Sequence, residues 1–70
     1  MILSVLVHAN NAVDVKRACI ALGYKVWVLR SSHLLVEMEG DDPPKEPIEA
    51  FIRLRKELYE RFTTDYAIRI

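Results

Sequence analysis

The chain has 70 residues with ten basic and ten acidic side chains, so its formal net charge is zero. This balance lacks the basic excess typical of proteins that bind phosphate backbones or anionic membranes. The 51% of hydrophobic residues excludes intrinsic disorder. We expect one domain over residues 1–70, because smaller pieces would not hold a core. A domain of this size buries only about 60% of its unfolded-chain surface, so the apolar content exceeds what one small core can hide.

The single cysteine, Cys19, allows no internal disulfide and favours a reducing, cytoplasmic setting. It lies between Ala18 and Ile20 in an apolar helical stripe, where a buried side chain is more common than a nucleophile. No stretch approaches the roughly 18–20 apolar residues that cross a bilayer, so no membrane is expected. The two glycines form no phosphate-binding loop. We therefore expect no catalytic site and no cofactor.

Six elements are expected along the chain. The aliphatic, β-branched start predicts a strand, and Asn11 can cap the helix that follows, which Gly23 can end. Pro47 suits the first turn of a second helix. The predicted elements are a strand at 2–7, a helix at 12–22, strands at 25–29 and 33–39, a helix from 47 to 62 and a closing strand at 63–70.

This order, β-α-β-β-α-β, is typical of the ferredoxin-like α+β fold. The fold predicts a four-stranded antiparallel sheet, in the order 4-1-3-2, with two helices on one face. An outer sheet face in water should be polar, but these strands do not alternate cleanly. We assign eight side chains to the helix side: Leu3, Val5, Val7, Val26, Val28, Leu34, Val36 and Met38.

Four large apolar side chains then point away from the helices: Leu6, Trp27, Leu29 and Leu35. A three-residue connection at 30–32 fits this assignment, because a two-residue turn would exchange the faces of one strand. Exposed apolar patches of this kind mark interfaces. We therefore expect a homodimer or higher oligomer, formed through the outer sheet face or through a sheet edge.

His8 and His33 are expected side by side on the outer face, because the first and third strands are neighbours. Two imidazoles could hold a metal, but a zinc site takes three or four protein ligands. We interpret both histidines as interface or surface residues. The acidic residues Glu37, Glu39, Asp41 and Asp42 surround turn formers and indicate a solvated loop. Trp27 could be a base-stacking platform, but the RNA-recognition signature is absent from 33–39.

The stretch Lys16-Arg17-Ala18-Cys19-Ile20-Ala21-Leu22-Gly23-Tyr24-Lys25-Val26 resembles the end of the first helix in the small PurS subunit of phosphoribosylformylglycinamidine synthase. The segment Asp65-Tyr66-Ala67-Ile68 is similar to the one before that family's last strand. Ser31-Ser32 stand where the family has Gly-Lys. The resemblance implies a non-catalytic subunit, whose dimer holds together the glutaminase and synthase subunits of a purine-biosynthesis amidotransferase complex.

Residues 26–39 with the following helix and strand also resemble the effector-binding, dimerising domain of Lrp/AsnC-type regulators. This second resemblance implies a stand-alone sensing domain that binds an amino acid or similar metabolite between subunits. ACT-type amino-acid-binding domains fit the same topology. We expect first a PurS-like structural subunit, second such a ligand sensor, and third an RNA-binding module or a metal-dependent nuclease of similar topology.

Overall fold

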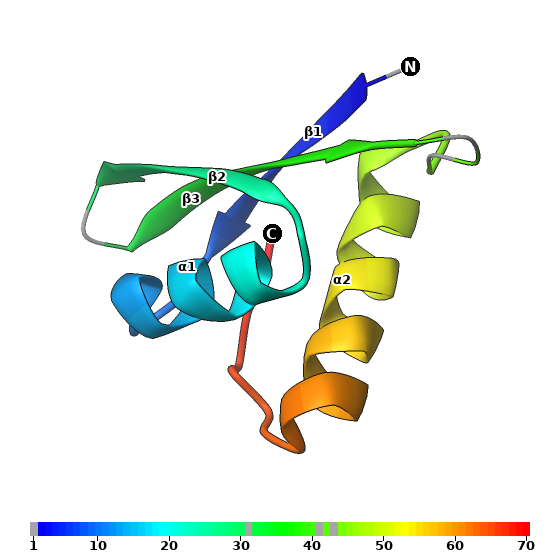
Figure 1. Ribbon diagram of the computed structural model, residues 1–70. Helices are drawn as coiled ribbons and strands as arrows, with labels where there is room; N and C mark the ends of the chain where they lie inside the picture. Colours follow the sequence, from blue (N-terminus) through cyan, green and yellow to red (C-terminus); the bar gives the residue numbers. More distant parts are fainter. Residues whose placement is uncertain (1, 31, 41, 43) are drawn as a thin grey trace.

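The computed structural model describes residues 2–30, 32–40, 42 and 44–70. It contains five elements in chain order (Figure 1): β1 (Ile2–His8), α1 (Ala12–Ala21), β2 (Lys25–Arg30), β3 (His33–Glu39) and α2 (Pro47–Phe62). The sheet is antiparallel, and β3 lies between β1 and β2. Both helices lie on the same face of the sheet (Figure 1). The bounds of these five elements agree with the sequence-based prediction to within one residue.

The predicted ferredoxin-like sheet of four strands in the order 4-1-3-2 is wrong, because the sheet has three strands in the order β1-β3-β2. Residues 63–70, called the tail below, pair with β1 at one position only. There His8 and Arg69 exchange two backbone hydrogen bonds of 2.7 and 3.0 Å. The structure is therefore a small α+β fold with a three-stranded sheet.

Two residues with left-handed backbone keep the tail from extending into a strand. Thr63, with φ of 54°, ends α2, and Ala67 has φ of 53°. A carboxylate oxygen of Asp65 accepts a hydrogen bond from the Ala67 amide at 2.9 Å, which closes a local turn. A left-handed β-branched residue such as Thr63 is rare, so the alternating apolar pattern of the tail could not reveal this course.

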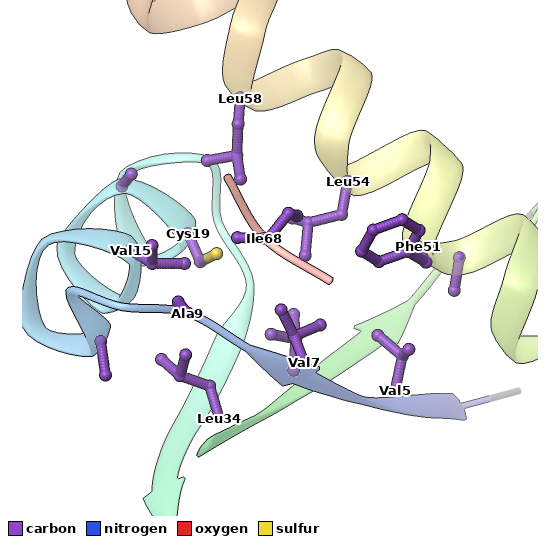
Figure 2. Packing of buried hydrophobic residues seen from close by; sticks show 14 of the residues in the cluster. Val5, Val7, Ala9, Val15, Cys19, Leu34, Phe51, Leu54, Leu58 and Ile68 are labelled. Carbon is purple, nitrogen blue, oxygen red and sulfur yellow. The ribbon is translucent and has the colours of Figure 1, made fainter. Parts of the chain in front are cut away.

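The core fills the space between the sheet and the two helices (Figure 2). Five of the eight side chains assigned to the helix side are buried, and Leu3 and Val26 pack against them. Val28 is 42% exposed although it pairs with the buried Leu34, because β2 is an edge strand. The buried side chains of the tail and helices include Ile68, Leu54, Leu58, Val15 and Cys19.

The ends of α1 form as predicted. The side chain of Asn11 accepts a hydrogen bond from the Asp14 amide at 3.3 Å and so caps the first turn. Gly23, with φ of 94°, follows the last turn in the left-handed conformation that glycine adopts without strain. After this turn the Tyr24 hydroxyl donates a hydrogen bond of 2.7 Å to Glu57 on α2. This contact joins the start of β2 to the second helix.

Candidate interaction surface on the sheet

Three large apolar side chains lie in one row across the outer face of the sheet. Leu6 of β1 and Trp27 of β2 are both paired with Leu35 of β3. Successive side chains in a strand point to opposite faces, so this row lies opposite to Val7 and Leu34, which face the core. Leu6 is 43% and Trp27 46% exposed. We call Leu6, Leu35 and Trp27 the apolar rung.

A β-bulge keeps Trp27 on this face. β2 ends at Arg30, which pairs with His33, so the connection is shorter than the three residues predicted. The register shifts between Val28 and Arg30, which leaves one extra residue in β2. This extra residue compensates for the shorter connection, so the predicted faces of the strands are retained. Leu29 lies at the bulge and is exposed, whereas Ser31 lies outside the described residues.

Polar side chains flank the apolar rung on both sides. On one side Glu37 of β3 pairs with Ser4 and with Lys25. On the other side His33 of β3 pairs with His8 and with Arg30, also from its two neighbouring strands. The outer face therefore has three rows of side chains, with the apolar rung in the middle. The row on one side contains the carboxylate of Glu37 and the ammonium group of Lys25. The row on the other side contains two imidazoles and the guanidinium of Arg30.

The structure brings His8 and His33 together as the strand order predicted. Their ring centroids are 4.0 Å apart, with 55° between the ring planes. The Ser32 hydroxyl oxygen lies 3.1 Å from Nδ1 of His33. Partial desolvation, followed by the charges of His8, Arg30 and Arg69, lowers the pKa of His33 below its usual value. In the described part of the chain, no three or more His, Cys, Asp or Glu residues gather into a group that could hold a metal ion.

Cys19 and the loop after β3 lie apart from the apolar rung. Cys19 is fully buried, as predicted, and burial raises the pKa of its thiol to about 12. Of the four acidic residues expected in a solvated loop, Glu37 and Glu39 belong to β3 instead, and Asp42 is exposed after it. Asp41 lies outside the described residues. The backbone carbonyl of Asp42 accepts a hydrogen bond of 3.0 Å from Arg53.

The outer edge of β1 offers backbone groups in addition to the sheet face. Both backbone hydrogen bonds of His8 to Arg69 lie on this edge. Backbone direction alternates along a strand, so Leu6, Ser4 and Ile2 also point their amides and carbonyls to it. Within the described residues, β1 has no pairing on this side beyond His8.

A pocket of about 420 Å³ between α2 and the tail was not expected from the sequence. Its floor includes Phe51, Leu58 and Ile68, and its rim includes Arg55 and Asp65. The helical period of α2 predicted which of its residues are buried. The sequence contains no comparable periodic pattern for the course of the tail, which forms the opposite wall of the pocket.

Comparison of the chain with protein-family models, with curated proteins and with solved structures gave no match. The geometry of the chain itself is therefore the basis on which its function is inferred. Among the described elements, neither helix combines the length and the apolar character needed to cross a bilayer.

Proposed function

We propose that this protein is a non-catalytic interaction module that forms a homodimer by stacking the outer faces of two sheets. The observation that carries the proposal is the apolar rung, three large side chains in register on the face of the sheet opposite to α1 and α2. Contiguous apolar surface bounded by polar residues is typical of protein interfaces. Trp27 belongs to one of the residue types that are enriched among interface hot spots.

A second copy of the chain is a suitable occupant because the face complements itself. Two stacked faces are related by a two-fold axis that lies between them. When this axis runs along the apolar rung, Trp27, Leu35 and Leu6 each meet their own copy. The same rotation brings Glu37 over the partner subunit's His33, since both residues lie on β3 at equal distances from Leu35.

An axis along the strands would be less favourable. It would bring Glu37 of one copy over Glu37 of the other, and two carboxylates at close range repel. An axis along the apolar rung also brings Lys25 over the partner subunit's Arg30. This contact of like charges costs less, because both residues lie on the edge strand β2, from which their long side chains reach solvent. The central strand therefore favours an axis that crosses the strands.

The direct test measures the molar mass in solution. We expect sedimentation equilibrium at micromolar concentration to give twice the 8.1 kDa of one chain. Trp27→Asp should give the monomer mass with an unchanged circular dichroism spectrum. Val13→Asp is the matched control: Val13 is 55% exposed on α1, away from the sheet, so this variant should remain dimeric. A wild-type chain that stays monomeric would reject the proposal.

The resemblance of residues 16–26 and 65–68 to the PurS family supports a more specific version of this proposal. In that version the dimer holds together larger amidotransferase subunits of purine biosynthesis. Co-purification of those subunits with the tagged wild-type protein would support it, and their absence from the wild-type preparation would speak against it.

A stand-alone sensing domain is the second candidate function, and the pocket between α2 and the tail favours it. A panel of amino acids should then raise the melting temperature, because a ligand that binds only the native state stabilises it. A flat response to the whole panel would leave the structural module as the function.

A further inference from the structure

The pocket between α2 and the tail has the size and the lining of a small-molecule site. Its volume of about 420 Å³ lies within the range of roughly 300–1,000 Å³ that is usual for such sites. The floor consists of core side chains, because Phe51, Leu58 and Ile68 are each less than a tenth exposed. An apolar group that entered the pocket would therefore lie directly on the hydrophobic core.

The walls add apolar and aromatic side chains that the chain itself leaves open. Ile52 is 60% and Tyr59 57% exposed on α2, and the half-buried Tyr66 faces them from the tail. Aromatic rings contribute large contact areas at low conformational cost. These walls favour a ligand with an aromatic or branched aliphatic body.

The charges at the rim favour an anionic end group. Arg55, Lys56 and Asp65 line the pocket, so its rim carries an excess of positive charge. Asp65 already accepts a hydrogen bond from the Ala67 amide. Nζ of Lys56 lies 3.8 Å from Oε1 of Glu60, so its charge is already paired. The guanidinium of Arg55 makes no hydrogen bond or ion pair with any residue that the structure describes. A guanidinium binds a carboxylate through two parallel hydrogen bonds.

We propose that this pocket binds a small organic monocarboxylate with an aromatic or branched apolar body. The body lies on Phe51, Leu58 and Ile68, and the carboxylate accepts hydrogen bonds from Arg55. The proposal does not depend on self-association, because the pocket and the apolar rung use different residues.

The test is a titration of the ¹⁵N-labelled protein with phenylacetate, followed by NMR. Amide shifts should change at the pocket residues, with a Kd of about 1 mM or below, in line with the size of the ligand. Phenylacetamide has the same body without the charge and should bind about tenfold more weakly. Acetate, which lacks the body, should leave the pocket signals unchanged.

Arg55→Gln should weaken phenylacetate binding by about tenfold, since one charged hydrogen-bond donor is lost. Arg61→Gln is the matched control: Arg61 lies on the same helix over the Phe62 ring, and affinity should not change. Equal binding of the acid and the amide by the wild-type protein would overturn the proposal, and so would shifts confined to residues outside the pocket. The wild-type comparison remains decisive even where a variant fails to fold.

Discussion

Glu37 and His33 lie on the same face of β3, one on each side of Leu35. A two-fold axis along the apolar rung exchanges their positions, so each carboxylate meets an imidazole of the partner subunit. An axis along the strands would instead bring like side chains together. The choice between the two arrangements can therefore be tested with charges alone.

Exchanging the two charges within one chain separates the two axes. In the double variant Glu37→Arg with His33→Glu, an axis along the apolar rung brings each new arginine over a new glutamate of the partner subunit, so the dimer should persist. An axis along the strands would bring arginine over arginine and glutamate over glutamate, which should weaken the dimer by about 1–2 kcal/mol or more. Sedimentation equilibrium measures this. Dissociation of the double variant would contradict the cross-strand axis, while the Trp27→Asp result would still decide whether the face is used.

Ser4→Pro separates face stacking from pairing through the β1 edge. The Ser4 amide points to the open edge, so proline there removes no hydrogen bond to β3 and blocks the addition of another strand. We expect the dimer to persist. Val5→Pro is the comparison variant: its amide points to β3, and losing it should destabilise the fold by about 3 kcal/mol. Dissociation by Ser4→Pro, together with a dimer that persists in Trp27→Asp, would show that the edge is the interface.

Tyr24→Phe should lower the free energy of unfolding by about 1.5–3 kcal/mol, because the half-buried hydroxyl bonds to the Glu57 carboxylate. Burial, and then this hydrogen bond and the charge of Glu57, raise the pKa of Tyr24. Tyr59→Phe should change stability by less than about 0.5 kcal/mol, since Tyr59 is 57% exposed. Urea denaturation measures both variants. Equal effects would mean that the Tyr24–Glu57 contact contributes nothing.

Cys19 should resist thiol reagents in the native protein. With a pKa raised to about 12 by burial, the thiol has almost no thiolate near neutral pH, and it is fully buried. The rate at which Cys19 is labelled should therefore be set by how often the folded protein opens, and it should increase strongly in denaturant. Stoichiometric labelling within seconds in buffer alone would contradict the burial of this residue.

Acid should destabilise the monomer through His33. Its pKa is lowered in the folded chain by partial desolvation and by His8, Arg30 and Arg69, so the unfolded chain binds the proton more readily. Stability is then complete above the usual histidine pKa of 6.5 and decreases as the pH falls below it. Melting curves in dilute solution, where the chain is monomeric, should show this decrease. His33→Gln should reduce it, and an unchanged pH profile would exclude His33 as its source.

The parts of the fold that the sequence predicted depend on local signals. Asn11, Gly23 and Pro47 mark helix ends through their own backbone preferences, and the helical period of α2 places Leu54 and Leu58 in the core. Ile68 is buried at 7% exposure, in agreement with the apolar pattern of the tail. The turns at Thr63 and Ala67 have no such signal, so the tail was predicted as a strand and the pocket beside it was missed.

A three-residue connection between β2 and β3 was expected to keep Trp27 on the outer face. The connection is shorter, and the bulge at Leu29 keeps Trp27 on that face instead. A bulge depends on how two strands pair and not on the composition of one segment. The alternation of side chains along each strand could therefore predict which residues lie on the outer face. It could not predict that a bulge keeps the register between β2 and β3.

The backbone pairing of His8 with Arg69 closes a loop that contains almost the whole chain. Closing so long a loop costs conformational entropy that only a nearly complete fold can offset. The tail should therefore dock late in folding and detach first in local opening. Each opening exposes the core around Ile68 while the three strands remain paired. Susceptibility to proteases at the C-terminal end then depends on one pair of hydrogen bonds and on the packing of Ile68, and much less on the stability of the domain as a whole.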